Sequence, residues 1–223
     1  MTYSIVGRCE KTRELGVCVA SAVPTVGSIV PYVEANVGAV ATQATSSACY
    51  GTNGLQLVRL GLSPKSVLEA LLLEDDKIEH RQVTIIDAKG RTAGFTGKQT
   101  IQWSGHHQGN NCVAAGNTLA GQSVIPAMTT AFESAEGPLE GRLMVALEAG
   151  QEAGGDKRGR RGSAAILVRK RFTEKETRRP SVDIRVDEHP DPVPELRRIL
   201  EIWKDRYSPS SPSFNYDYHR RRV

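Results

Sequence analysis

A threonine directly follows the first methionine and opens a β-rich segment, residues 2–8, in which polar and apolar side chains alternate. A small second residue permits removal of Met1, and Thr2 then carries a hydroxyl nucleophile and a free α-amine on one residue. The pKa of an α-amine is about 7.7–8.0, so the amine can accept the hydroxyl proton without a separate histidine. The alternative is structural, because many chains carry a second-position threonine by chance.

A second segment that could bind a ligand or take part in catalysis, residues 154–163, is rich in glycine and cations. Its backbone N–H groups and the side chains of Lys157 and Arg158 could surround a carboxylate or a phosphate, and Asp156 could align a nucleophile or an amine. The segment lacks the residue order of a nucleotide-binding P-loop. The alternative is a solvated turn in which Asp156 pairs with a neighbouring arginine.

Polar side chains follow two buried, strand-like segments at the point where each segment ends. Gln43 and Thr45 follow one apolar run, and Asn117 follows another. Strand ends of this kind often line pockets, where amide and hydroxyl donors bind a substrate or stabilise an oxyanion. Both segments precede predicted helices, so helix capping is the competing explanation.

The histidines and cysteines predict no metal site, and we expect no cofactor. His106 and His107 are adjacent, so on an extended chain their side chains point to opposite sides and rarely bind one metal together. The four cysteines are widely spaced and lie mostly in apolar, strand-like runs: Cys9, Cys18, Cys49 and Cys112. We therefore expect buried free thiols rather than disulfides or zinc ligands.

The charge distribution argues against a nucleic-acid-binding surface. The chain has 223 residues and a formal net charge of +4, and the last arginines, residues 220–222, contribute most of this excess. A second basic run, residues 169–179, is interleaved with glutamates and is expected to be a solvated hairpin. No segment approaches the ~20 apolar residues that span a bilayer, and the N-terminus lacks a signal-peptide pattern. These observations predict a cytoplasmic protein that binds neither nucleic acid nor membranes.

The pattern along the chain groups strands with strands and helices with helices. Alternation and β-rich composition predict strands at 2–8, 15–21, 37–43, 82–87, 91–96, 111–117, 163–168 and 182–186. Helical periodicity and the Ser63-Pro64 start signal predict helices at 51–60, from 64 onward, and at 122–134, 138–151 and 193–206. We therefore expect an α+β fold, a four-layer αββα sandwich of two mainly antiparallel sheets.

One domain, residues 1–206, is expected to precede a tail, residues 207–223. The tail combines serines, prolines and aromatic residues and ends in arginines. Such a composition is typical of a segment that becomes ordered only by lying on another surface. We expect the tail to pack across its own domain or across a symmetry-related subunit, which favours a homo-oligomer.

Several short motifs along the chain resemble those of one known family. They are Met1-Thr2-Tyr3-Ser4-Ile5-Val6-Gly7-Arg8, residues 37–44, Tyr50-Gly51 with Gly54-Leu55, residues 87–91, Ala115-Gly116-Asn117 with residues 119–121, residues 149–151 with 154–159, and residues 186–192. Together they make the chain similar to an uncharacterised bacterial family, labelled only as a domain of unknown function and assigned to the N-terminal-nucleophile (Ntn) hydrolase-like fold. The resemblance covers nearly everything before the tail. It implies an αββα sandwich and brings no established substrate.

The wider Ntn superfamily implies roles for particular positions of this chain. The residue that opens the first strand is the nucleophile, and its α-amine is the proton acceptor for cleavage of an amide or acyl bond. Thr2 matches this role. In the proteasome-like branch a carboxylate closes the second strand and a lysine on a following strand tunes the nucleophile. Here Ser21 stands near the first of these positions, and no lysine lies between Lys11 and Lys65.

The residues and the resemblance together predict hydrolysis of an amide or acyl bond in a small polar substrate, with Thr2, Ser21 and Asp156 as the catalytic group. Aromatic residues are scarce, at 5% of the chain, which favours a small polar ligand over a large flat one. Two alternatives stay open: a non-catalytic protein that holds a small anionic molecule at residues 154–163, and a structural subunit that acts through assembly. The predicted substrate-binding residues are Gln43, Thr45, Asn117, Lys157 and Arg158.

Overall fold

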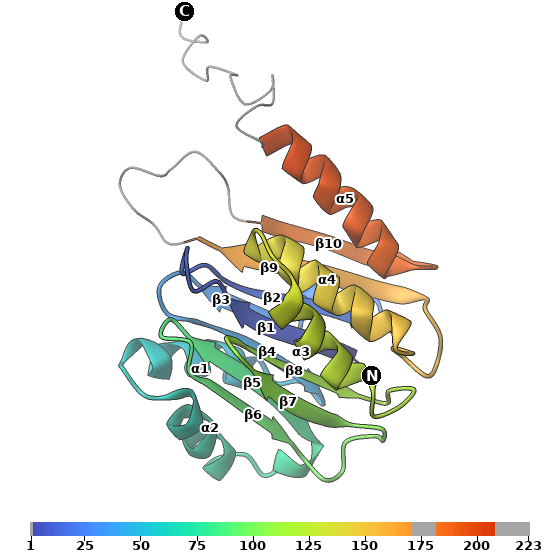
Figure 1. Ribbon diagram of the computed structural model, residues 1–223. Coiled ribbons are helices and arrows are strands. Elements are labelled where there is room, and N and C mark those ends of the chain that lie inside the picture. Colours follow the sequence, from blue (N-terminus) through green and yellow to red (C-terminus); the bar gives the residue numbers. More distant parts are fainter. Residues whose placement is uncertain (1, 171–181, 208–223) are drawn as a thin grey trace, which may run out of the picture.

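The computed structural model describes residues 2–170 and 182–207, and within these ranges the chain forms two antiparallel sheets and five α-helices. Figure 1 shows the two sheets stacked between two groups of helices. The predicted tail, apart from Tyr207, and most of the predicted basic hairpin lie outside the described residues. The expectations for those two segments therefore stay predictions.

The larger sheet has six strands in the order β10-β9-β2-β1-β8-β7. Its strands are β1 (Thr2–Arg8), β2 (Leu15–Ser21), β7 (Gly105–Gly109), β8 (Cys112–Asn117), β9 (Gly162–Arg169) and β10 (Val182–His189). β1 lies in the interior of the sheet between β2 and β8, and it is buried along its whole length because other layers cover both faces. The first residue of β1, Thr2, pairs with Asn117 at the end of β8.

The smaller sheet has four strands in the order β3-β4-β5-β6. Its strands are β3 (Pro31–Glu34), β4 (Gly38–Ala44), β5 (Arg81–Asp87) and β6 (Thr92–Thr96). The register of β4 and β5 places Gln43 directly opposite Gln82. The two hairpins predicted from the sequence, β1 with β2 and β5 with β6, are both present as antiparallel pairs.

The helices form the outer layers, as the predicted αββα sandwich requires. The α-helices are α1 (Ala48–Arg59), α2 (Pro64–Leu73), α3 (Val124–Ser134), α4 (Leu139–Glu152) and α5 (Pro192–Tyr207), and two short 3-10 helices span Val26–Ser28 and Ile78–His80. α1 and α2 pack on the smaller sheet, whereas α3, α4 and α5 pack on the larger one (Figure 1). The predicted α+β fold with two antiparallel sheets is confirmed.

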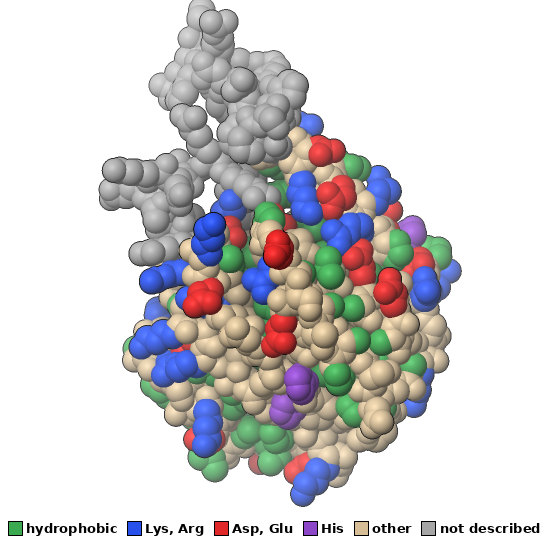
Figure 2. All heavy atoms as spheres, viewed as in Figure 1, with side chains coloured by type: hydrophobic (Ala, Val, Ile, Leu, Met, Phe, Trp, Pro, Cys, Tyr) green, Lys and Arg blue, Asp and Glu red, His purple; other side chains and the backbone are tan. Residues whose placement is uncertain are grey.

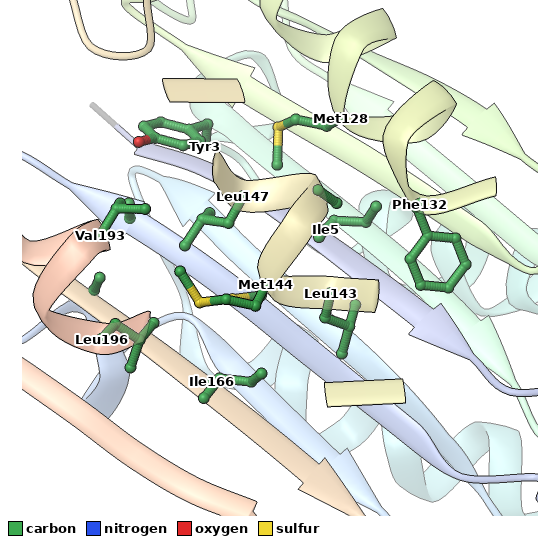
Figure 3. Close-up of a cluster of buried hydrophobic side chains, with 14 of the residues drawn as sticks. Tyr3, Ile5, Met128, Phe132, Leu143, Met144, Leu147, Ile166, Val193 and Leu196 are labelled. Atoms are coloured by element: carbon green, nitrogen blue, oxygen red, sulfur yellow. The ribbon is translucent and has the colours of Figure 1, made fainter. Parts of the chain in front are cut away.

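Three hydrophobic cores hold these layers together. The largest core lies between the six-stranded sheet and helices α3, α4 and α5, where Phe132, Leu143 and Leu147 pack against Ile5 (Figure 3). A second core lies between the two sheets, and a third lies between the smaller sheet and helices α1 and α2. Since alternate residues of each strand face opposite sides, each sheet contributes one face to the core between the sheets and one face to a helical core.

The predicted start signal of α2 is confirmed. The hydroxyl oxygen of Ser63 accepts a hydrogen bond from the backbone N–H of Ser66 at 3.1 Å, and Pro64 is the first helical residue. The start predicted for α1, residue 51, is wrong by three residues because the helix begins at Ala48.

Two strands were not predicted, and both lie at sheet edges. β3 has only four residues and begins with Pro31, and β7 consists of small and polar residues. An edge strand makes ladder hydrogen bonds on one side only and tolerates proline and polar side chains, so it lacks the apolar alternation that marks a buried strand.

The four cysteines are free thiols, and three are buried: Cys9, Cys18 and Cys112. Burial raises the pKa of the Cys112 thiol to about 12, so that it stays protonated at neutral pH. Cys49 is exposed, which corrects the expectation of burial at that position.

The described residues show a mixed surface charge, no membrane-spanning helix and no group of metal ligands. Figure 2 shows acidic and basic side chains interspersed over the face that it draws. None of the helices in residues 2–170 and 182–207 is long and apolar enough to cross a membrane. In the same residues, no three His, Cys, Asp or Glu side chains are grouped so that they could hold a metal ion.

Candidate active site

Thr2 lies in the six-stranded sheet, and its side chain faces the smaller sheet. It is 5% exposed, and its hydroxyl Oγ1 donates a hydrogen bond to the hydroxyl of Ser21 at 3.1 Å. Ser21 is the last residue of β2, and its Oγ also accepts a bond from the backbone N–H of Val23 at 3.4 Å. The structure therefore brings the predicted nucleophile and the predicted second-strand residue into direct contact.

A buried cluster of amide side chains lies beside Thr2 in the space between the sheets. The Gln43 side-chain amide Nε2 donates to the Oε1 of Gln82 at 2.8 Å and to the backbone carbonyl of Thr2 at 3.5 Å. The Asn117 amide Nδ2 also donates to Gln82 Oε1, at 3.0 Å, and Ser4 donates its hydroxyl to Gln43 Oε1 at 2.7 Å. Two predicted binding residues, Gln43 and Asn117, are thus joined to each other through Gln82, which was not among the predicted site residues.

Gln82 is the centre of this cluster and has no exposed surface. Besides the two bonds that its oxygen accepts, its Nε2 lies within hydrogen-bond distance of Thr96 Oγ1 at 3.1 Å and of the carbonyls of Gly105 and Gly116 at 3.0 and 2.8 Å. These partners lie on β6, β7 and β8, so one side chain ties the smaller sheet to the larger one. The signal available in the sequence was a glutamine at an inward-facing position of a strand rich in valine and isoleucine. A buried amide needs hydrogen-bond partners, so such a glutamine indicates a polar cluster.

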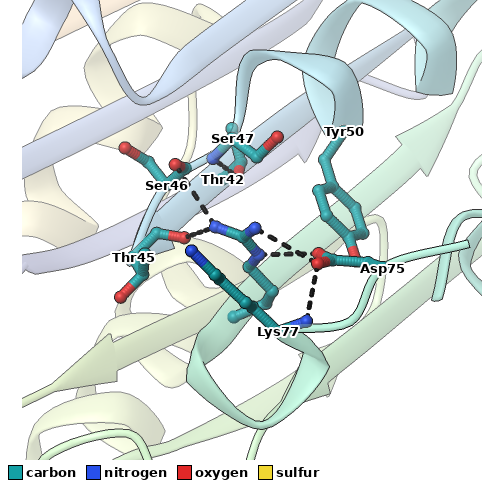
Figure 4. Close-up of polar contacts among 8 residues, drawn as sticks. Thr42, Thr45, Ser46, Ser47, Tyr50, Asp75 and Lys77 are labelled. Atoms are coloured by element: carbon teal, nitrogen blue, oxygen red, sulfur yellow. Dashed lines mark hydrogen bonds and ion pairs between the residues drawn. The ribbon is translucent and has the colours of Figure 1, made fainter.

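The segment that follows β4 is anchored by a partly buried ion pair (Figure 4). The guanidinium of Arg81 donates to the Asp75 carboxylate at 2.6 Å and to the backbone carbonyl of Thr45 at 2.6 Å, and Tyr50 donates its hydroxyl to Asp75 at 2.9 Å. Hydrogen bonding to Arg81 holds the pKa of Asp75 well below its usual range. Burial and the bond to Asp75 raise the pKa of Tyr50.

Thr45 itself is exposed, and its backbone rather than its side chain makes the contact with Arg81. The competing explanation, helix capping, is not supported by side-chain bonds either, because Ser47 at the start of α1 and Ser123 at the start of α3 make no capping hydrogen bond. A substrate contact of Thr45 therefore stays a prediction.

The glycine-rich loop, residues 154–163, folds against the end of β2. The carboxylate of Asp156 accepts hydrogen bonds from the backbone N–H groups of Ala22 at 3.2 Å and Arg158 at 2.7 Å. Gly155 has a φ of 51°, a left-handed conformation that glycine adopts without strain and that turns the chain into this contact. The loop thus places Asp156 next to the strand end that carries Ser21.

The cations of the loop already have partners among the described residues. Lys157 donates to the carbonyl of Gln102 at 2.9 Å, and Arg158 lies 3.5 Å from the Asp156 carboxylate. Arg160 pairs with Asp191 at 3.0 Å, and Arg161 pairs with Glu188 at 2.8 Å. The arrangement agrees with the structural alternative for this segment, in which Asp156 pairs with a neighbouring arginine.

A polar cavity of about 230 Å³ opens between this loop, the end of β2 and the start of α5. Ser21, Asp156 and Arg160 line it, together with Tyr3, whose hydroxyl donates to the side chain of Gln151 at 3.2 Å. Burial raises the pKa of Tyr3, and the Asp156 carboxylate adds to this effect. Thr2 and Gln43 are not among the lining residues, so Ser21 connects the cavity with Thr2.

The predicted site residues therefore fall into three sets. Thr2, Ser21, Gln43 and Asn117 lie together at one end of the space between the sheets: Thr2 bonds to Ser21 and Gln43, and Gln82 joins Gln43 to Asn117. Asp156 shares the cavity with Ser21 but directs its carboxylate to backbone N–H groups. The other three, Thr45, Lys157 and Arg158, are exposed: the Thr45 carbonyl accepts from Arg81, Lys157 donates to a backbone carbonyl, and Arg158 pairs with Asp156.

Comparison with known proteins identifies relatives of this chain. The sequence model of a family of unknown function, DUF1028, matches residues 2–196. A crystal structure of a DUF1028 protein from Silicibacter pomeroyi is 31% identical, has a TM-score of 0.81, and aligns over 91% of this chain and 89% of that chain. Anbu (ancestral beta-subunit) from Yersinia bercovieri is 9% identical, with a TM-score of 0.40 over 90% of this chain and 92% of its own. No curated protein matches the chain.

Proposed function

The chain belongs to the DUF1028 family of unknown function, and we propose that it is an Ntn-type hydrolase that cleaves an amide or acyl bond of a small polar substrate. Thr2, exposed by removal of Met1, is the nucleophile. The observation that carries the proposal is the hydrogen bond from the Thr2 hydroxyl to Ser21, a residue that lines the polar cavity. This bond orients a hydroxyl at the start of an interior strand, on the residue that would also carry the free α-amine.

The chemistry that this arrangement supports is nucleophilic catalysis. The Thr2 hydroxyl oxygen bonds to the substrate carbonyl carbon while its proton moves to the α-amine, and the amine then protonates the leaving nitrogen or oxygen as the acyl bond breaks. A water molecule, deprotonated by the same amine, cleaves the resulting ester and frees Thr2. The side chains of Gln43 and Asn117 lie beside Thr2 and supply the polar surroundings of the reacting carbonyl.

The cavity supports a small polar substrate. Its volume of about 230 Å³ is below the range of typical drug-sized pockets, and its lining includes carboxylate, guanidinium, amide and hydroxyl groups. Asp156 and Arg160 offer both signs of charge at this lining. The proposed substrate therefore carries polar groups close to the scissile bond.

The anion-binding alternative receives less support. The four cations of residues 154–163 bond to carboxylates or a carbonyl, so an anion would have to displace these partners. The assembly alternative depends on the tail, which lies outside the described residues. Self-association and a cytoplasmic location stay predictions.

Intact-mass measurement of protein made in its native host tests the first requirement. Loss of Met1 is expected, and complete retention would contradict the proposal because an acylated nitrogen is no base. The processed protein is then treated with a β-lactone, which acylates activated hydroxyls, and digested. We expect the added mass on the peptide that begins with Thr2.

Three variants separate catalysis from folding in a screen of small chromogenic amides and esters. Thr2→Ala is expected to lower the rate by at least about 10³-fold, whereas Thr2→Ser retains a measurable rate. Thr52→Ala is the matched control, because Thr52 is exposed on α1 and bonds only locally. Equal rates for the Thr2→Ala and Thr52→Ala proteins would overturn the assignment.

A further inference from the structure

A second polar cavity, of about 270 Å³, lies at the opposite end of β1 from Thr2. Arg8, the last residue of β1, lines it, and the seven-residue strand places Arg8 about 20 Å from Thr2. Its other lining residues come from the β1–β2 turn, the β7–β8 turn and the facing ends of α3 and α4: Glu10, Asn110, Asn111, Glu133 and Arg142. All six lining side chains are charged or carry an amide.

The guanidinium of Arg8 is held in place by two hydrogen bonds, and one of its N–H groups has no protein acceptor among the described residues. The residue is 8% exposed, and its Nε and Nη1 atoms donate to the carbonyl of Ala88 at 2.9 Å and to the Asn111 side chain at 3.0 Å. These two bonds join the β5–β6 turn to the β7–β8 turn. Within residues 2–170 and 182–207, the Nη2 group donates to no protein atom, although a buried guanidinium normally uses its donors.

Arg142 presents a second guanidinium in the same way. It stacks over the ring of Phe132 at 4.2 Å, and its Nε and Nη2 atoms donate to the carbonyl of Phe132 at 3.3 and 3.1 Å. Its Nη1 group has no protein partner in the described part of the chain. The side chain is therefore already ordered, so that binding an anion would cost little additional conformational entropy.

The two carboxylates of the cavity do not neutralise these arginines. Glu133 accepts a hydrogen bond from the backbone N–H of Asn110 at 2.6 Å, and Glu10 makes no hydrogen bond or ion pair with a described residue. No ion pair joins either glutamate to Arg8 or Arg142, although all four line one cavity. Most other arginines of the described chain, Arg59 and Arg81 among them, do pair with a carboxylate.

We propose that this second cavity binds a small zwitterion of the α-amino-acid type. The carboxylate of the ligand accepts hydrogen bonds from the unused guanidinium donors of Arg8 and Arg142, and its ammonium group lies against Glu10 and Glu133. A cavity of this volume holds several water-sized groups, enough for a small amino acid and too few for a peptide. The inference is independent of the proposed hydrolase activity, because the two cavities share no lining residue.

Thermal unfolding of the full chain with L-alanine, acetate or methylamine, each at about 10 mM, tests the proposal, because this concentration largely fills a site of millimolar affinity. L-Alanine is expected to raise the melting temperature by at least about 2 °C, more than acetate does, whereas methylamine has no effect. An equal response to acetate would indicate an anion site and overturn the zwitterion. No response to L-alanine would also overturn the proposal.

Variants locate the site. Arg142→Gln is expected to abolish the response to L-alanine, and Glu10→Gln is expected to reduce it to the response that acetate gives. Glu10 is exposed and pairs with no residue that the structure describes, so its variant should fold normally even where loss of Arg142 lowers stability. Arg59→Gln, which removes an exposed arginine paired with Glu34, is the matched control and retains the full response. A response that persists in both cavity variants would place the ligand elsewhere and overturn the assignment.

Discussion

The two ends of the space between the sheets differ in their chemistry. At the end where β1 begins, hydroxyl and amide side chains fill the space: Thr2, Ser4, Gln43, Gln82 and Asn117. Toward the other end, before the buried Arg8 that ends β1, the facing residues are apolar: Val6, Leu15, Val17, Ile86 and Val113. Apolar burial stabilises roughly in proportion to area, whereas buried amides stabilise only in the geometry that satisfies their hydrogen bonds. The polar end therefore fixes the surroundings of Thr2, and the apolar end supplies much of the stability.

Replacing Gln82 at the polar end should give the largest change in the free energy of unfolding. Gln82→Leu leaves the Gln43 and Asn117 amides and the carbonyls of Gly105 and Gly116 without their buried partner. Four partners are lost at about 1–3 kcal/mol each, so the free energy of unfolding should fall by at least about 4 kcal/mol in urea denaturation.

The control for Gln82 is an exposed glutamine on α1. Gln56→Leu should change the free energy of unfolding by no more than about 0.5 kcal/mol. If Gln82→Leu costs no more than Gln56→Leu, the amide cluster does not hold the sheets together at this end.

Loss of the ion pair between Asp75 and Arg81, next to the polar end, should give the next largest change in stability. Asp75→Asn removes the charge that Arg81 and Tyr50 contact and should lower stability at neutral pH by about 1–3 kcal/mol. The pKa of Asp75 is lower in the folded state than in the unfolded state. Its stabilisation is therefore present above the unfolded pKa of about 3.9 and is lost as the pH falls below it.

Unfolding measured from pH 7 down to acid tests the sign of this effect. The Asp75→Asn protein should lose less stability on acidification than the unmodified protein. Asp76→Asn is the matched control, because Asp76 is the exposed neighbour, and its acid profile should be unchanged. Parallel profiles for all three proteins would contradict the assignment.

A smaller effect is expected when a hydroxyl is placed at the apolar end. Val17 is fully buried between the sheets, and Val17→Thr keeps the shape of the side chain but buries a hydroxyl among apolar groups. Stability should fall by about 1–2 kcal/mol, measured by thermal or urea unfolding. An unchanged stability would show that this end tolerates polar groups as the Thr2 end does.

The smallest expected effect has the opposite sign. The Thr84 hydroxyl is buried between the two ends and has no hydrogen-bond partner among the described residues. Thr84→Val should therefore raise the free energy of unfolding by about 0.5–1 kcal/mol. Thr42→Val is the control, because the Thr42 hydroxyl accepts a bond from the backbone N–H of Ser47, and the same change there should destabilise.

The change from polar to apolar residues along β1 and β5 is present in the sequence, but only some of its polar residues were predicted as site residues. Alternate positions read Thr2, Ser4, Val6 along β1, before Arg8 ends the strand, and Gln82, Thr84, Ile86 along β5. The polar residues at the ends of β4 and β8, Gln43 and Asn117, were selected as candidates. Gln82 precedes its apolar run instead of following it, so the pattern of a polar residue at the end of a strand does not mark it.

Local signals alone determined the interior strands, the two hairpins, the Ser63-Pro64 helix start and the α+β class, because alternation, periodicity and caps act over a few residues. The tertiary structure decided which strand ends meet. Antiparallel register brings the start of β1 and β5 to the ends of β2, β4 and β8, so that Thr2, Ser21 and Gln82 gather at one end. It also decided that Lys157, Arg160 and Arg161 bond to a carbonyl and two carboxylates far away in the chain. The guanidinium donors that Arg8 and Arg142 keep available depend in the same way on the packing of separate elements.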